Sequence, residues 1–186
     1  MSRFSAIHLS FGYALQKKLE IPVGLFYGAV GGTPSGRWLS VKMAADDKEL
    51  DRQFEKANGY SLVNYEKQTE ALVEKWQEAV KSAKAEGKRR PRGPVRLGDL
   101  YQSKIEHFVP YGMRGVLWDQ GESKTKVPGV ANQVVVMRAL ISGWRKVWNQ
   151  GDFPFLHIQK PSGGVAPWNL DNPVTVSYTH LRAHET

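Results

Sequence analysis

The sequence contains no cysteine, so the chain can form neither a disulfide bond nor a thiolate metal site. This absence leaves open the redox compartment in which the protein works. The sequence also lacks a signal-peptide pattern and any apolar run of about 18 residues, the length that a membrane-spanning helix needs. We therefore expect no membrane-spanning segment and no membrane partner.

Acidic residues are few, since 18 of them stand against 26 basic ones, which leaves a formal net charge of +8. Much of the excess lies in "KRRPRGPVR", residues 88–96. Such a basic run can attract nucleic acid or an anionic surface. It holds no aromatic side chain of the kind that single-strand binders stack on bases. The sequence thus favours an exposed, solvated connection and no nucleic-acid partner, with nucleic-acid binding as the weaker alternative.

Apolar residues recur along the chain with the periods of helices and buried strands, and 186 residues that are 41% hydrophobic suffice for one core. Three- and four-residue spacings predict helices over residues 4–19, 62–83 and 134–148, of which the second lies in a charge-rich insertion at about 46–96. Short continuous apolar runs are typical of strands buried on both faces. These runs are "VGLFYGAV" (residues 23–30), "MRGVLW" (113–118) and "FPFLHIQ" (153–159).

Helical and strand patterns alternate along the chain, which predicts an α/β fold, a sandwich around a mostly parallel sheet. In such folds ligands bind beyond the carboxyl ends of the strands. Two polar clusters lie there, because "GGTPSGRW" follows the first predicted strand and "DQGESKT" follows the second. The sequence therefore predicts a site at these two clusters.

Neither cluster matches a phosphate-binding loop or a serine nucleophile elbow. Gly31 and Gly36 have the spacing of a phosphate loop, but arginine and tryptophan follow them instead of lysine and serine or threonine. "GESKT", residues 121–125, begins like the G-x-S-x-G elbow but ends in a threonine, whose side chain would crowd the tight turn. We therefore expect that Ser123 is not a nucleophile.

Three longer stretches carry a resemblance to a known family. "LYQSKIEHFVPYGMRGVLWDQGES", "LISGWRKVWNQGDFPFLHIQ" and "IPVGLFYGAVGGTPSGRW" resemble the sialate O-acetylesterase-like (SASA) branch of the SGNH hydrolases. The similarity covers about residues 4–170, and its most specific parts are W-x-Q-G-E at 118–122 and W-R-K-x-W-x-Q-G-D-F-P-F at 144–155. The resemblance implies a flavodoxin-like three-layer α/β/α sandwich. It also implies a carbohydrate O-acetylesterase that uses a serine, acts on an acetylated carbohydrate and needs no cofactor or metal ion.

The resemblance assigns roles to residues of both polar clusters, namely Gly31, Gly32, Arg37, Trp38, Gln120 and Glu122. The Gln120 amide helps to form the oxyanion hole, and a backbone N–H of Gly31 or Gly32 is the second donor. Glu122 either orients the catalytic histidine as the acid of a triad or braces the loop structurally. The arginine and the tryptophan line the sugar site, with a packed tryptophan as the alternative.

Two blocks of the family are absent from the sequence: the G-Q-S-N-type block of its nucleophile and the D-x-x-H block of its histidine. We therefore expect residues 1–175 to be an SGNH domain that is incomplete at both ends, and the chain by itself to be inactive. The alternative is a non-catalytic carbohydrate-binding relative. His180 and His184 have the spacing of a zinc pair, but they lie in "TVSYTHLRAHET", which looks like a translated sequencing adapter. Residues 176–186 are therefore interpreted as a non-native tail.

Overall fold

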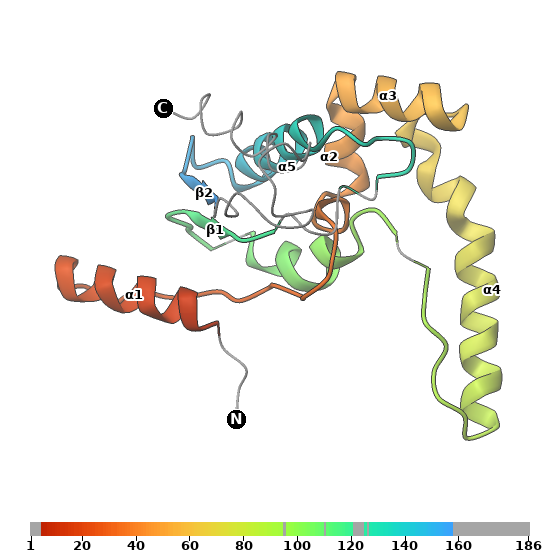
Figure 1. The fold of residues 1–186 in the computed structure, drawn as a ribbon, viewed down its shortest axis with the longest axis horizontal. Coiled ribbons are helices and arrows are strands. Elements are labelled where there is room, and N and C mark those ends of the chain that lie inside the picture. Colours follow the sequence, from red (N-terminus) through yellow and green to blue (C-terminus); the bar gives the residue numbers. More distant parts are fainter. Residues whose placement is uncertain (1–4, 95, 110, 121–124, 126, 158–186) are drawn as a thin grey trace, which may run out of the picture. The chain divides into compact units, whose positions relative to one another are not determined.

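The computed structural model describes residues 5–94, 96–109, 111–120, 125 and 127–157. The chain divides into two compact units, Met1–Gly31 and Gly32–Thr186. Figure 1 shows the helices and strands of both units along the ribbon.

Helix α1 of the first unit spans Ala6–Leu19 and confirms the first predicted helix. Its start is set by Ser5, whose side chain accepts a hydrogen bond from the His8 amide at 3.3 Å. Its end is set by Glu20, which adopts a left-handed conformation with a φ of 55° and donates its N–H to Gln16 O at 2.9 Å. Both ends are therefore determined by local hydrogen bonds.

The predicted strand at residues 23–30 is wrong, because the structure assigns no strand to them. Strands β1 (Val116–Trp118) and β2 (Phe155–His157) pair with each other in a two-stranded sheet. The segment 23–30 has no place in that ladder, and a strand is stable only beside a partner, whatever its own apolar content. Its two aromatic side chains are largely open to solvent, with Phe26 46% and Tyr27 45% exposed.

The second unit contains a strand, a helix and a strand in succession: β1, α5 and β2. Helix α5 spans Gln133–Trp148 and confirms the helix predicted at 134–148. The strands run parallel, with Val116 opposite Phe155. A parallel pair needs a crossover connection, and α5 lies in that connection. Both strands occur where they are predicted but begin later, and β2 starts directly after Pro154, which has no N–H to donate.

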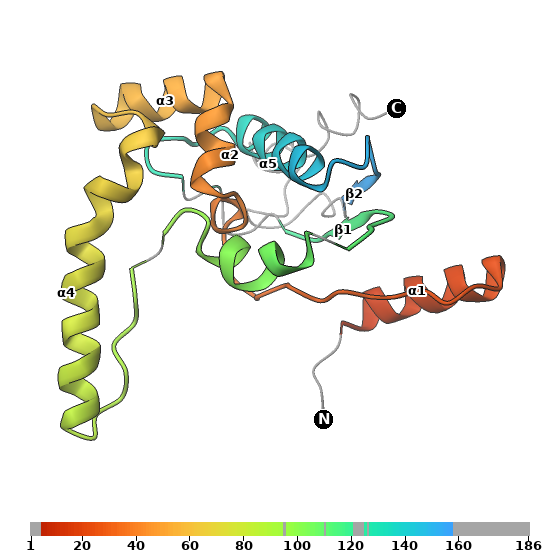
Figure 2. The ribbon, with the colours of Figure 1, turned by 180° about the vertical axis from the view of Figure 1, so that it is seen from behind.

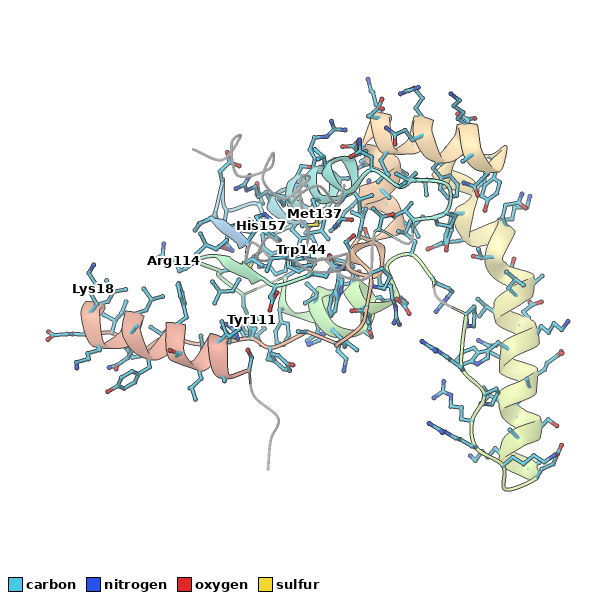
Figure 3. All side chains as sticks on the ribbon, viewed as in Figure 1. Lys18, Tyr111, Arg114, Met137, Trp144 and His157 are labelled. Atoms are coloured by element: carbon cyan, nitrogen blue, oxygen red, sulfur yellow. The ribbon has the colours of Figure 1, made fainter. Side chains whose placement is uncertain are left out.

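Aromatic side chains of α5 pack against the β1–β2 pair. The Trp144 ring centroid lies 6.1 Å from that of Trp118 in β1 and 5.7 Å from that of Phe155 in β2. Its indole N–H donates to the Trp38 carbonyl oxygen at 3.1 Å. Met137 and Trp144 are 0% and 4% exposed and lie inside the second unit (Figure 3). Burying an apolar side chain of this size contributes about 1.5–3 kcal/mol.

Two further helices, α2 (Val41–Asp46) and α3 (Lys48–Asn58), pack near α5 (Figure 2). Asp47 separates them, and its carboxylate accepts hydrogen bonds from two amides in the first turn of α3, at 3.1 and 2.9 Å. The same carboxylate accepts from Arg138 of α5, at 2.8 Å from Nη2 and 3.2 Å from Nε. One side chain therefore begins α3 and fastens it to α5.

Helix α4 spans Tyr65–Ala85 and confirms the helix predicted in the charge-rich insertion. Figures 1 and 2 show α4 extending away from the other helices of the second unit, with the following segment running back beside it. The Trp76 indole N–H of α4 donates to Pro91 O of that segment at 3.1 Å. We call α4 and the returning residues 86–94 the arm.

Short single-turn elements complete the described part of the second unit: η1 (Ser35–Trp38), η2 (Leu62–Asn64), the π-helix η3 (Tyr101–Ile105) and η4 (Glu106–Phe108). Mixed helices and a small parallel sheet are compatible with the predicted α/β class. The three-layer sandwich and the domain boundaries stay predictions. Over the residues that the structure describes, no helix combines the length and the apolar character needed to cross a membrane.

Gly143 of α5 lies against α2, and we predict that Gly143→Ala destabilises the second unit. A Cβ atom at this position would lie 2.6 Å from Met43 Cγ and 2.8 Å from Met43 Cβ, which are too near the α2 backbone to move freely. Urea denaturation should show a loss of about 1–3 kcal/mol in the free energy of unfolding. Ser142→Ala, at the exposed neighbouring position, is the control. Equal stability of the Gly143 variant and the wild type would contradict this packing.

Candidate functional site

Four polar residues from three parts of the second unit meet beyond the carboxyl end of β1. They are Gln120 after β1, Thr33 and Ser35 at η1, and Gln133 at the start of α5. Gln120 Nε2 donates to Thr33 O at 3.2 Å, and Gln120 Oε1 accepts from Gln133 Nε2 at 3.4 Å. We call these four residues the amide cluster.

Most of the amide cluster is buried. Ser35 is 0% exposed, Gln133 1% and Thr33 8%, and Gln120 is half-buried. Ser35 Oγ donates to Gln133 Oε1 at 3.3 Å and accepts from Gln133 Nε2 at 3.2 Å. Burying polar groups is costly unless they are hydrogen-bonded. These bonds therefore hold η1, the end of β1 and the start of α5 in one arrangement.

These hydrogen bonds also determine the orientation of the Gln120 carboxamide. Because its Oε1 faces Gln133, its Nε2 faces the backbone at Thr33. The cluster holds no titratable side chain, so it offers neutral donors and acceptors and no proton to transfer. Neutral N–H donors of this kind can stabilise a negative charge that develops on an oxygen atom. In the described part of the chain no three histidine or acidic side chains gather as metal ligands would, and His180 and His184 lie outside that part.

The two glycines predicted as backbone donors directly precede the amide cluster in the sequence. Gly32 adjoins Thr33 and has a φ of 69°, a left-handed conformation that favours glycine. Gly31 is the last residue of the first unit and Gly32 the first residue of the second. Gly32 therefore shares its unit with Gln120, and the donor role of either glycine stays a prediction.

Glu122, predicted as a triad acid or a loop brace, lies outside the described residues, as does Ser123. The chain is described again at Thr125, whose carbonyl oxygen accepts the Gly36 N–H at 3.0 Å. A Cβ atom at Gly36 would lie 2.9 Å from that oxygen, so the close approach requires glycine. The described residues on either side of Glu122 thus both contact the segment around η1, Gln120 at the Thr33 carbonyl oxygen and Thr125 at the Gly36 N–H.

Arg37 and Trp38, predicted to line the sugar site, follow Ser35 on η1. Arg37 forms a two-bond ion pair with Asp99, with Nε 2.8 Å from Oδ1 and Nη2 2.5 Å from Oδ2. Trp38 is 5% exposed, and its ring meets that of Trp118 edge-on at 6.4 Å. The structure therefore packs the tryptophan in the core, which is the alternative interpretation. Contact of either residue with a sugar stays a prediction.

Sequence reasoning singles out Gln120 but misses its partner Gln133. Helix periodicity is counted on apolar residues, so a polar side chain on the inward face of a helix goes unnoticed. The available signal is a glutamine in the first turn of an otherwise apolar buried stripe, "NQVVVM". Such a residue must find a buried partner. That partner cannot be named without the fold, because Ser35 lies 98 positions away.

We predict that Gln133→Ala lowers the stability of the second unit. The change removes a buried partner of Ser35 Oγ and of Gln120 Oε1, so the free energy of unfolding should fall by about 1–3 kcal/mol in urea denaturation. Gln77→Ala removes the same side chain from an exposed helical position of α4. It should change stability by less than about 0.5 kcal/mol. If the two variants have the same free energy of unfolding, the amide cluster contributes nothing to the stability of the second unit.

The chain is similar to a curated protein, the sialate O-acetylesterase of the rat, Rattus norvegicus, with 25% identity over 196 residues. The alignment covers 98% of this chain and 33% of that protein, so the chain spans about a third of the relative's length. No family model matches the chain. No solved structure matches it. The similarity supports at most a distant relationship to this sialate O-acetylesterase.

Proposed function

We propose that this chain is part of a carbohydrate O-acetylesterase, which hydrolyses acetyl esters on sugars by a serine mechanism. The observation that carries the proposal is the position of the Gln120 carboxamide. It lies beyond the carboxyl end of β1, half-buried and held by Gln133 and the Thr33 backbone. This is where an α/β fold presents a ligand. The name of the similar rat protein supports the reaction class.

In such an esterase a serine attacks the ester carbonyl and a histidine takes the serine proton, while negative charge develops on the carbonyl oxygen. We assign Gln120 Nε2 and a backbone N–H of Gly31 or Gly32 as donors to this oxygen. The orientation of the Gln120 side-chain amide supports this assignment, because its Nε2 faces Thr33, the residue after Gly32. Each well-aimed donor lowers the barrier by roughly 3–4 kcal/mol. Neutral donors suit this task, since they stabilise the charge without exchanging a proton.

The serine and the histidine come, in this proposal, from sequence outside these 186 residues, which lack both family blocks. Glu122 then acts either as the acid that orients the histidine or as a brace of the loop between Gln120 and Thr125. Arg37 and Trp38 are assigned to the sugar side of the site, with Trp38 supporting it from the core. The substrate is an acetylated carbohydrate.

The same proposal includes the finer fold class, a flavodoxin-like three-layer sandwich of the SGNH type. The unit β1–α5–β2 supports it, because two parallel strands joined through a helix are the repeating element of such a sheet. The remaining strands of the sandwich would come, in this proposal, from sequence beyond this chain.

The decisive experiment is Gln120→Ala in the longer protein encoded by the parent gene. Turnover of 4-nitrophenyl acetate should fall about 10²-fold or more, with a smaller change in KM, because the lost donor acts on the transition state. Gln102→Ala, an exposed glutamine on η3, is the matched control and should keep full turnover. The 186-residue chain, assayed beside them, should show no turnover above background. Unchanged turnover in Gln120→Ala would remove this residue from the oxyanion hole, and a longer protein that binds acetylated sugar without turnover would be a binding relative.

Ser123 provides a second test in the same protein. Ser123→Ala should leave most of the turnover, since the sequence around it fails the nucleophile-elbow pattern. Replacing the serine of a G-Q-S-N-type block in the longer protein should abolish turnover, and both variants are compared at equal folded concentration by circular dichroism. Complete loss in a folded Ser123→Ala variant would make Ser123 the nucleophile and overturn the proposed mechanism.

A further inference from the structure

A basic pocket lies between the arm and η1, and apart from Arg37 its arginines have no part in the proposed esterase site. Its volume is about 310 Å³. The lining residues that matter here are Arg37, Trp76, Arg90, Arg92, Arg96 and Asp99. This volume is at the lower end of the range for small-molecule sites, roughly 300–1,000 Å³.

The pocket carries a large excess of positive charge. Four arginines line it beside a single aspartate, Asp99. Both carboxylate oxygens of Asp99 are taken by Arg37, at 2.8 and 2.5 Å. Among the residues that the structure describes, Arg92 and Arg96 form no ion pair with a carboxylate. The guanidinium groups of Arg92 and Arg96 are thus not neutralised by a described carboxylate.

The backbone of the returning segment and the Arg90 side chain are held against Trp76 of α4. The Trp76 indole N–H donates to Pro91 O at 3.1 Å, and the Arg90 guanidinium carbon lies 4.9 Å from the centroid of the Trp76 ring. Gly93 lies against the same ring, where a Cβ atom would come within 3.1 Å of it. Pro91 and Pro94 restrict the backbone further. A loop held in this way loses little conformational entropy on binding.

The geometry and charge distinguish among anions. A carboxylate has two oxygens and one charge, whereas a phosphate or sulfate group has more acceptor oxygens and up to two charges, which several guanidinium groups can share. Single-stranded nucleic acid would need an exposed ring for base stacking. Trp76 lines this pocket but is covered by Arg90 and Gly93.

We propose that the basic pocket is a binding site for a tetrahedral oxyanion, a phosphate or sulfate group, held by Arg90, Arg92 and Arg96. These three arginines have no role in the esterase proposal, which involves the pocket only through Arg37, the arginine that is paired with Asp99. Its ligand is either the free ion or a phosphate or sulfate ester of a small molecule such as a sugar.

Isothermal titration calorimetry at constant ionic strength tests the site, with sodium sulfate or sodium phosphate replacing sodium chloride. Wild-type protein should give saturable binding, and Arg92→Gln and Arg96→Gln should each weaken it about tenfold or more. Arg89→Gln is the matched control, because it removes the same charge from the same segment without lining the pocket. It should change the affinity by less than about twofold. Circular dichroism confirms that each variant is folded.

Two further arms identify the source of the anion. Glucose 6-phosphate that binds as tightly as phosphate, with glucose silent, assigns the site to a phosphate ester, and weaker binding assigns it to the free ion. Absence of saturable heat in the wild type overturns the proposal. So does an equal loss in Arg89→Gln, which would make the effect one of net charge alone. Tight binding of a short single-stranded oligonucleotide that sulfate does not displace would replace the oxyanion site with a nucleic-acid surface.

Discussion

The packing of Trp144 is the constraint on which the second unit depends. Its ring contacts Trp118 of β1 and Phe155 of β2, and its indole N–H donates to the Trp38 carbonyl oxygen at the end of η1. Because the ring is 4% exposed, this N–H needs a partner inside the protein. One side chain of α5 therefore holds three segments together that are far apart in the sequence. Apolar contact brings them close, and the directional hydrogen bond selects how η1 is placed.

The amide cluster is a consequence of that arrangement. Trp38 anchors the end of η1 and Trp118 anchors the end of β1, so the polar residues next to each anchor come together. Gln133 belongs to the same helix as Trp144 and reaches both segments at once. The core and the candidate site thus share their supporting elements. A substitution that shifts α5 relative to the strands should therefore disturb the hydrogen bonds of Gln120.

Helix η1 lies between a neutral region and a positively charged one. Ser35 at its start belongs to the neutral amide cluster, and Arg37 on the same turn joins the basic pocket through its ion pair with Asp99. Neutral N–H donors that are fixed in place can stabilise a negative charge that develops on an oxygen atom during a reaction. Uncompensated guanidinium groups suit a standing charge. One short helix therefore supports two regions that differ in charge.

Local patterns in the sequence determine the helices α4 and α5, the positions of β1 and β2, and the polar residues after β1. The reason is that the spacing of apolar side chains and the capping groups are encoded within a few neighbouring positions. The position of Gln120 directly after β1 is predictable for the same reason, since its motif is contiguous. Only the tertiary structure decides whether an apolar run becomes a strand, because pairing needs a second segment, and the run at 23–30 has none in the described sheet. Only the tertiary structure brings Gln133 to Ser35 and Arg37 to Asp99. These partners are separated by 98 and 62 positions, and a hydrogen bond over such a separation depends on how the whole core packs.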